Sequence, residues 1–325
     1  MGQVLSSLEI IVTAHYNLSK GLSMLFRDER YLCKIAVFLF LCISPNSLLS
    51  NEKVIYGKDN RKDLYEITDS KWIDNAQAVA ALIPLEHFKK SDDVPGFWRL
   101  KSTTLVEEGF CHDEKYTSQQ AAAQCSGFLV HHNVLITAGH CVKSLKTCEK
   151  TRWVFGYDLS KKDKDYNLIP QDNIFECSEV ISYFPGENDD EPDYAILRLN
   201  RSVQGRKPLK LRKKGSVKKG ERLYVAGFPL GLPLKIAGGA WVRKNSEGPY
   251  FSSNLDSFEG NSGGPVFNEK DHLVEGILVG GEDDFFWDSK EDCFRIKRCS
   301  EKGCQGESVT KIMTLKELGE LIGKS

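Results

Sequence analysis

The chain has 325 residues, of which 41% are hydrophobic, 27% charged and 10% aromatic; this composition excludes a disordered chain and suffices for a large core. Its 44 basic and 45 acidic residues leave a formal net charge of −1, so the overall charge does not favour nucleic acid as a partner. The length predicts one large domain or two small ones.

The N-terminal segment resembles a secretory signal. From Met24 onward, basic residues precede the apolar run 35–43, and small polar residues follow it up to Ser50. A basic flank, a short apolar core and a polar exit are typical of a cleaved signal peptide, and the run is too short to span a bilayer easily. We therefore expect residues 1–50 to be an N-terminal extension with a signal peptide, starting at Met1 or Met24. The mature chain is expected to be secreted or periplasmic, without a stable membrane span; a short N-terminal anchor is the alternative.

Eight cysteines remain once the signal is removed. An even number of cysteines in an exported chain favours disulfides. Zinc binding by the last three is the alternative, but a fourth ligand is not evident and the compartment disfavours it. We expect disulfides and no metal. The eight residues are Cys111, Cys125, Cys141, Cys148, Cys177, Cys293, Cys299 and Cys304.

The remaining chain has the pattern of an all-β protein. Residues 51–75 are polar and charged, and we expect either a propeptide or an ordered N-terminal arm. Over 76–325, short apolar segments alternate with turns, which is typical of a sandwich or barrel. The first hairpin joins 127–130 to 134–138 through the turn 131–133. Further strands are predicted at 153–155, 180–183, 194–199, 223–227, 265–267 and 274–279.

Two charged segments and the C-terminus carry weaker signals. The basic segment 206–219 is interpreted as a solvated linker between two barrels, with an electrostatic docking patch as the alternative. The acidic segment 187–191 is interpreted as a solvated loop, with a calcium site as the alternative. Apolar residues near the end recur at helical spacing and predict a docked C-terminal helix. They are Leu315, Leu318, Leu321 and Ile322.

Ser262 lies in the segment GNSGGPVF at 260–267, where three glycines and a proline around it set the backbone conformation. A serine hydroxyl is a weak nucleophile at neutral pH and needs a base within hydrogen-bond reach, which a further group must orient. Gly260 has no Cβ, so its N–H can approach a substrate oxygen closely. Together with the N–H of Ser262, it would stabilise negative charge on an attacked carbonyl oxygen. The segment predicts a nucleophile; an ordinary glycine-rich turn is the alternative.

Two further residues complete a set that would activate this serine. His140 follows a predicted strand, and the small residues before it leave space for its imidazole. Cys141 is its neighbour and Cys125 precedes the hairpin, so a disulfide between them would cross the hairpin base and contribute roughly 3 kcal/mol in the chain-entropy model. Asp193 opens an alternating strand, and a carboxylate that becomes buried there needs a partner. We predict that Asp193 orients His140.

The motifs TAGHC, DYAILRL and GNSGGPVF, in this order, strongly resemble those of the chymotrypsin-like (trypsin-like) serine proteases over residues 76–320. The resemblance implies an all-β fold of two packed six-stranded antiparallel barrels with a C-terminal helix. It implies that Ser262 attacks the scissile carbonyl, that His140 transfers the proton and that Asp193 holds the imidazole. The N–H groups of Gly260 and Ser262 would form the oxyanion hole.

The chain also departs from the animal digestive enzymes of this family. Asn261 stands where they have an aspartate, so their activation switch is not expected. Asn261, the arm 56–63 and the segment GFPLGLP at 227–233 look closer to the secreted bacterial branch around the glutamyl endopeptidases. The Glu-specific members of that branch carry a histidine that is missing from 276–281. Specificity for acidic residues is therefore not expected.

Three residues are candidates for substrate binding. Asp256 lies six residues before Ser262, where trypsin-like enzymes place the carboxylate that binds Arg or Lys. Phe258 replaces the cysteine expected nearby, so Asp256 either forms the floor of a pocket for basic residues or caps a turn. Gly280 and Gly281 would offer their backbone to an extended substrate strand.

These residues predict a secreted serine endopeptidase that acts on proteins or peptides as a monomer, without a metal or cofactor. A catalytically weak binding or chaperone-like protein on the same fold is one alternative. An esterase is another, although the strand–turn–helix elbow of that class does not surround Ser262.

Overall fold

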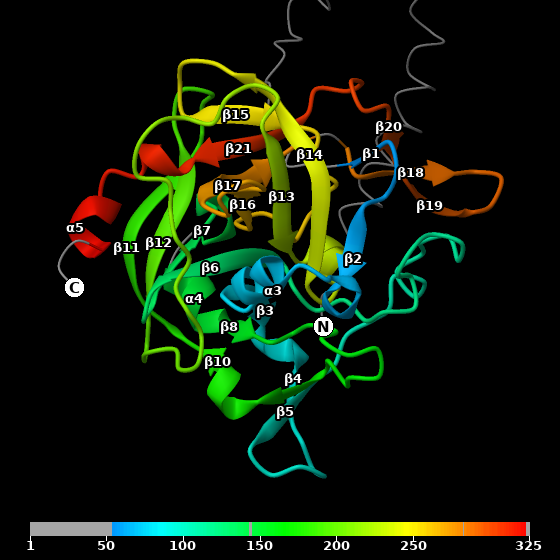
Figure 1. The fold of residues 1–325 in the computed structure, drawn as a ribbon. Coiled ribbons are helices and arrows are strands. Elements are labelled where there is room, and N and C mark those ends of the chain that lie inside the picture. Colours follow the sequence, from blue (N-terminus) through cyan, green and yellow to red (C-terminus); the bar gives the residue numbers. More distant parts are fainter. Residues whose placement is uncertain (1–53, 143–144, 282, 323–325) are drawn as a thin grey trace, which may run out of the picture. The chain divides into compact units, whose positions relative to one another are not determined.

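The computed structural model describes residues 54–142, 145–281 and 283–322. The predicted signal segment at 1–50 lies outside these residues. Two seven-stranded antiparallel sheets contain most of the strands of the described part (Figure 1). Among the described residues, no helix combines the length and apolar character that a membrane crossing requires. The all-β class predicted from the alternation of short strands and turns is confirmed.

The N-terminal sheet has the strand order β10-β8-β3-β6-β7-β12-β11. The predicted first hairpin is β6 (Cys125–His131) and β7 (Val134–Thr137). All six residues of β3 (Val79–Pro84) are buried, so this strand has a continuous apolar run rather than an alternating pattern. The other strands are β8 (Thr151–Phe155), β10 (Ile174–Phe175), β11 (Cys177–Pro185) and β12 (Asp193–Leu199).

The two-barrel architecture implied by the resemblance is present, but the N-terminal sheet is a half-barrel and not a closed six-stranded one. It has seven strands, and no pairing within the described ranges joins its outer strands β10 and β11. The helix α4 (Leu145–Lys150) contacts both β8 and β11. The disulfide between Cys148 and Cys177 ties this helix to the start of β11. The helix and its disulfide therefore bridge the side of the sheet that further strand pairing would close.

The C-terminal sheet does close into a six-stranded barrel. Its order is β13-β16-β17-β21-β15-β14, and β13 also pairs with β14, while β2 adds an edge strand. Buried apolar side chains such as Val225, Val266 and Leu278 form its core. The strands are β2 (Arg61–Asp63), β13 (Arg222–Gly227), β14 (Lys235–Asn245), β15 (Tyr250–Ser253), β16 (Pro265–Asn268), β17 (Val274–Gly280) and β21 (Glu307–Lys311).

Residues 54–75 form an ordered arm that packs on the C-terminal barrel. Strand β1 (Ile55–Tyr56) pairs in parallel with β20 (Arg298–Cys299), and β2 pairs with β14. Asp63 Oδ1 and Lys235 Nζ form an ion pair at 2.7 Å, and both side chains are buried. Strand pairing and an ion pair thus tie this segment to the C-terminal barrel.

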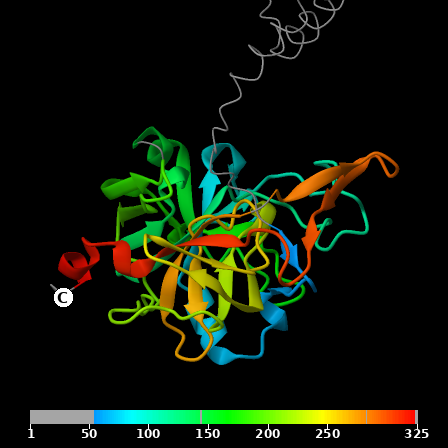
Figure 2. The same cartoon turned by 90° about the horizontal axis from the view of Figure 1, so that it is seen from above.

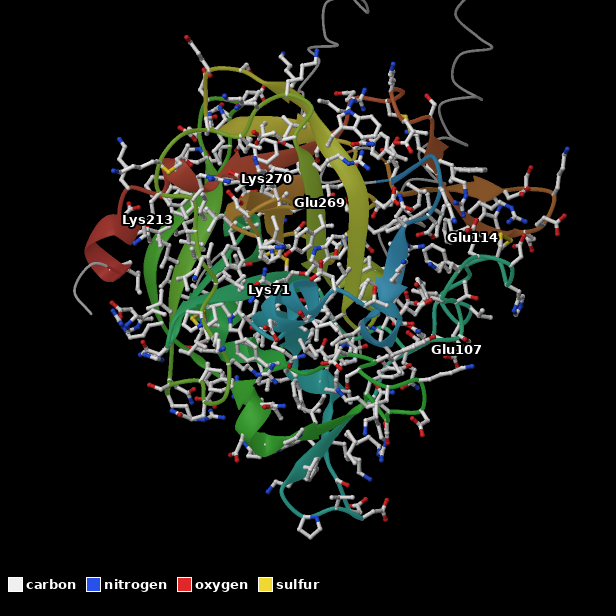
Figure 3. The ribbon with its side chains drawn as sticks, viewed as in Figure 1. Lys71, Glu107, Glu114, Lys213, Glu269 and Lys270 are labelled. Atoms are coloured by element: carbon white, nitrogen blue, oxygen red, sulfur yellow. A yellow bond between two sulfur atoms is a disulfide. The ribbon has the colours of Figure 1, made fainter. Side chains whose placement is uncertain are left out.

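Smaller elements complete the described part. The segment between β12 and β13 crosses from one sheet to the other with exposed lysines, including Lys213 (Figure 3), and is held by the buried Leu209 and Leu211. The chain ends in the short helix α5 (Leu318–Ile322), whose first residue is buried in the core. The other elements are α3 (Ser70–Ala76), β4 (Phe88–Lys90), β5 (Phe97–Leu100), β9 (Leu168–Pro170), β18 (Phe285–Asp288) and β19 (Cys293–Ile296).

Candidate active site

His140 stands where β7 ends and a short 3-10 turn (Gly139–Cys141) begins. A disulfide joins Cys141 to Cys125 at the start of β6, 16 residues earlier. A ring nitrogen of His140 lies within 4.8 Å of both sulfur atoms. Because the sulfurs are bonded to each other, they offer no thiolate to a metal. The disulfide instead holds the backbone that carries the imidazole.

Asp193, the first residue of β12, is buried beside this imidazole. Its Oδ2 lies 2.6 Å from His140 Nδ1, a short distance typical of a charge-assisted hydrogen bond. Its Oδ1 accepts hydrogen bonds from the backbone N–H groups of Gly139 (2.6 Å) and His140 (3.1 Å). A Cβ at residue 139 would lie 2.0 Å from the carbonyl oxygen of Phe184, so only glycine fits there. The carboxylate is thus held from two sides and fixes the orientation of the ring.

Ser262 is linked through its backbone to the same hairpin that carries the histidine. Its carbonyl accepts a hydrogen bond of 2.7 Å from the N–H of Ser126 on β6. The next residue, Gly263, has φ +86°, and a Cβ there would lie 2.1 Å from the Ser126 carbonyl oxygen. Ser262 and His140 line one pocket of about 440 Å³. The strand β6 and the glycine therefore bring Ser262 and His140 to a common cavity from positions 122 residues apart in the sequence.

Gly260 lines the same pocket with its backbone. Its φ is +84°, and a Cβ would lie 2.3 Å from the carbonyl oxygen of Phe228, so a side chain is excluded. The Ser126 hydroxyl donates to the Gly260 carbonyl at 2.7 Å and accepts from the Phe228 N–H at 3.1 Å. The Gly260 N–H has no hydrogen-bond partner within the part of the chain that the structure describes, so it is available to a substrate oxygen. Our sequence reasoning did not identify Ser126, which no motif marks.

Asp256 lies against the N-terminal arm. Its side chain is buried, Oδ1 accepts from the N–H of Tyr56, and Oδ2 accepts from the N–H of Asn60, both at 2.7 Å. The N–H of the next residue, Ser257, donates to the carbonyl of Val54. Burial raises the pKa of Asp256 to about 7 in spite of these hydrogen bonds. Asp256 thus accepts hydrogen bonds from the backbone of the arm and does not line the pocket of Ser262 and His140.

This burial predicts a pH dependence of stability. Since the folded state raises the Asp256 pKa from 3.8 to about 7, the neutral form is favoured on folding, and stability falls as the pH rises through this window. The loss amounts to roughly 4 kcal/mol at most. In Asp256→Asn this contribution disappears. Urea unfolding at pH 4 and pH 8 should therefore give a smaller difference between the two pH values in the variant; an unchanged difference would contradict the assignment.

The two glycines proposed to bind substrate backbone occupy the end of β17. Gly280 pairs with Ser308 of β21, and Gly281 follows it directly. Neither is among the described residues that line the pocket of Ser262 and His140. Instead, β17 supports the serine loop, because the Gly263 N–H donates to the carbonyl of Leu278 at 2.7 Å.

The pocket also contains acidic residues that the sequence did not single out. Glu259, Asp283 and Asp284 give it three carboxyl groups, and its described lining residues include no lysine or arginine. Asp284 is buried and accepts a hydrogen bond of 2.7 Å from the Glu259 N–H. Phe285, the first residue of β18, completes this wall. These residues follow a strand without any recognisable motif, so only the folded chain reveals them.

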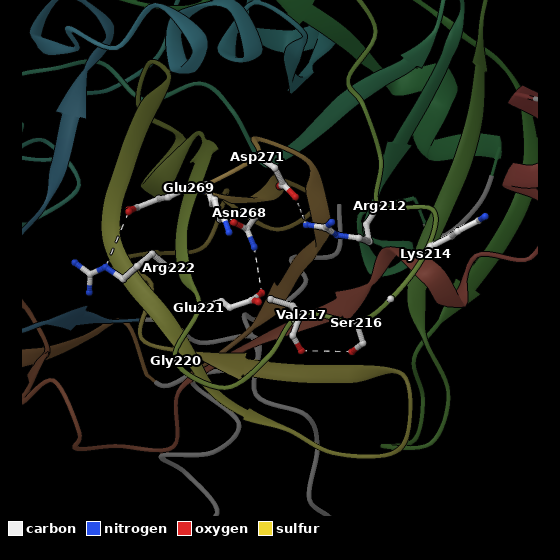
Figure 4. Close-up of a pocket in the computed structure, with 12 residues that line it drawn as sticks. Arg212, Lys214, Ser216, Val217, Gly220, Glu221, Arg222, Asn268, Glu269 and Asp271 are labelled. Atoms are coloured by element: carbon white, nitrogen blue, oxygen red, sulfur yellow. Dashed lines mark hydrogen bonds and ion pairs between the residues drawn. The ribbon is translucent and has the colours of Figure 1, made fainter.

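A second pocket, of about 660 Å³, lies between the basic linker and residues 268–271 (Figure 4). One of its cations, Arg212, is already paired, because it bonds to Asp271 at 2.7 Å and to Glu275 at 2.6 Å. Acidic and basic side chains alternate along the rest of its wall. The described residues that line this pocket do not include a histidine that could act as a base for a serine nucleophile. We therefore assign this pocket no function.

Residues 125–277 match the family model described as the trypsin-like peptidase domain. This range contains His140, Asp193 and Ser262. Over these residues, about half of its length, the chain is therefore similar to trypsin-like peptidases. The relatives to which the chain is similar include glutamyl endopeptidases.

Individual relatives are distant. A glutamyl endopeptidase of Staphylococcus epidermidis is 29% identical over 168 residues, covering 49% of this chain and 54% of the relative. Mouse granzyme B(G,H) is 26% identical over 192 residues, covering 51% of this chain and 73% of the relative. A solved structure of a Glu endopeptidase with MPD covers 83% of this chain at 14% identity and a TM-score of 0.48. The chain thus spans about half the length of the glutamyl endopeptidase.

Proposed function

We propose that this chain is a secreted serine endopeptidase, with residues 76–325 as its protease domain. The observation that carries the proposal is the pair of contacts at His140: its Nδ1 is bound by Asp193, and the ring shares a pocket with Ser262. An imidazole held at Nδ1 keeps its proton there and leaves Nε2 as the base. The four disulfides support an oxidising compartment.

The reaction follows from these positions. Ser262 Oγ attacks the scissile carbonyl carbon while its proton moves to His140 Nε2, and the Asp193 carboxylate stabilises the imidazolium. The carbonyl oxygen becomes negatively charged and accepts hydrogen bonds from the N–H groups of Gly260 and Ser262. His140 then protonates the leaving amine, the C–N bond breaks, and an acyl-serine ester remains. Water, deprotonated by the same imidazole, hydrolyses this ester.

We further propose that the enzyme prefers substrates with basic residues next to the scissile bond. The basis is the pocket wall of Glu259, Asp283 and Asp284, in which Asp283 lies 3.9 Å from Lys297 Nζ and Asp284 accepts from the Glu259 N–H. Asp256 is not part of this basis, because it does not line the pocket. The same wall would repel an acidic substrate residue.

A peptide library with every residue at each position tests both parts of this proposal. We expect cleavage that a sulfonyl fluoride stops, predominantly after Arg or Lys. Cleavage after Glu would reject the specificity. No cleavage by the folded wild type would reject the endopeptidase and favour a binding protein on this fold.

Substitution of Gly260 tests the oxyanion hole. An alanine at φ +84° is strained, and its Cβ would displace the Phe228 carbonyl at 2.3 Å, so the N–H must move. We expect kcat to fall by about 10²–10³ with little change in KM. Gly248→Ala is a matched control, because Gly248 also has positive φ, yet nothing lies within 4 Å of a Cβ there. Similar kcat losses in both variants would show strain alone and contradict the assignment.

A further inference from the structure

A β-hairpin of strands β18 and β19 begins at the wall of the catalytic pocket. Its first residue, Phe285, lines the pocket together with Ser262 and His140. Figure 1 and Figure 2 show this hairpin, in orange, projecting from the body of the domain. It pairs with no other strand in the described part of the chain. A substrate chain that leaves the pocket on this side would therefore run along the hairpin.

The hairpin is held firmly to the loop that precedes β6. A disulfide joins Cys293 on β19 to Cys111 in this loop, across 182 residues. The backbone of Phe294 forms hydrogen bonds to Gly109 (2.9 Å) and Cys111 (3.1 Å). Arg295 also bonds to Asp113 at 2.9 Å. Because these contacts fix one of its two strands, the hairpin can present a preformed surface.

One face of the hairpin carries an aromatic strip that starts at the pocket. Side chains alternate along a strand, so Phe285 and Trp287 share a face. Both contact Phe294 of β19, with ring centroids 5.3 Å and 4.9 Å apart. The indole is 49% exposed. Phe110 of the loop before β6 packs on both Phe285 and Phe294, with ring centroids 5.2 Å and 5.9 Å away, so these two rings are partly buried. Phe285, Phe294 and Trp287 thus form a continuous apolar strip whose exposed part is the Trp287 ring.

The opposite face of the same hairpin differs. Phe286 is 52% exposed, as much as the indole, but its cross-strand partner is Arg295. It therefore offers an exposed ring of similar size that is not continuous with the pocket. Substitution of Phe286 is therefore a control for effects that arise only from the loss of an exposed aromatic ring.

We propose that the aromatic strip of Phe285, Phe294 and Trp287 binds an apolar side chain of an extended polypeptide substrate. This inference rests on the proposed endopeptidase function and names its substrate class: polypeptides with a large apolar residue outside the scissile pair. Two residues of a strand span roughly 7 Å, so this residue lies at least two positions away from the one in the pocket. Burial of an apolar side chain against the exposed Trp287 ring and the partly buried Phe285 ring supplies the binding energy.

Two peptides with the same cleavage site test the strip, a short one and one extended by a segment that carries a phenylalanine. In Trp287→Ser we expect KM for the long peptide to rise about tenfold, with kcat unchanged and the short peptide unaffected. Phe286→Ser should leave both peptides unaffected. Equal effects of the two variants, or no preference of the wild type for the long peptide, would overturn the proposal.

A binding measurement separates this inference from catalysis. Fluorescence anisotropy gives the Kd of the labelled long peptide for Ser262→Ala and for Ser262→Ala with Trp287→Ser. We expect the double variant to bind about tenfold more weakly. Equal affinity would overturn the strip whether or not the wild type cleaves peptides. If sedimentation instead shows that Trp287→Ser dissociates a dimer, the strip binds a second copy of the chain and the proposal is wrong. Failure of the wild type to cleave either peptide would reject only the endopeptidase.

Discussion

Replacement of Ser262 by alanine is expected to lower kcat by about 10⁶, the loss typical of a serine protease without its nucleophile. The variant keeps the Gly260 N–H and the pocket, so KM should change little. A slow reaction should persist that is still faster than uncatalysed hydrolysis in water. The side chain is small and 4% exposed, so its loss leaves the backbone contacts with β6 intact. Single-turnover assays with a cleaved library peptide measure this. Activity within about a hundredfold of wild type would exclude Ser262 as the nucleophile.

The second large effect is expected for Asp193→Asn, which should lower kcat by about 10⁴ while the protein stays folded. The asparagine oxygen can still accept from the N–H groups of Gly139 and His140. Its NH₂ group then faces His140 Nδ1, which must become an acceptor and pass its proton to Nε2. A protonated Nε2 cannot take the proton of Ser262. The variant thus loses the base without losing the hydrogen-bond network around it.

Asp190→Asn is the matched control for this prediction, because Asp190 lies in the exposed loop just before β12. It should leave kcat unchanged. The pH profile of kcat/KM and circular dichroism of both variants complete the comparison. If Asp193→Asn retained near-normal turnover while folded, another group would have to orient His140.

Much of the fold could be predicted because its strands are short apolar segments between turns. Both strands of the first hairpin and the predicted strands from β8 to β17 are present in the structure. The pattern missed β14, where Gly238 and Gly239 interrupt the strand and Trp72 packs where a Cβ of Gly238 would lie. It also missed that the N-terminal sheet stays open between β10 and β11, the side that α4 and its disulfide bridge.

The site was predictable where local backbone demands leave a mark in the sequence. Gly139, Gly260 and Gly263 each stand where a Cβ would collide with a carbonyl oxygen, so they give the motifs their recognisable form. The environment of Asp256 leaves no such mark, because its partners Tyr56 and Asn60 lie about 200 residues away. Alignment without gaps to trypsin-like enzymes predicts that Asp256 lies in a substrate pocket. In the folded chain its carboxylate oxygens accept hydrogen bonds from the arm.

The hairpin beside the pocket could not be predicted either, because its contacts also join residues that are far apart in the sequence. The disulfide between Cys111 and Cys293, which are 182 residues apart, attaches the hairpin to the loop before β6. An even number of cysteines in a sequence does not specify which of them pair. The acidic pocket residues Asp283 and Asp284 follow β17 without a motif. Contacts over such separations follow from the completed fold and not from local pattern.

The most direct test of the central claim is covalent labelling of the purified chain with a fluorophosphonate, followed by mass spectrometry of its peptides. The account predicts one adduct, on Ser262, in the wild type, and a strongly slowed labelling rate in Asp193→Asn. A folded wild-type chain that takes up no label, or carries it on a residue other than Ser262, would contradict the account.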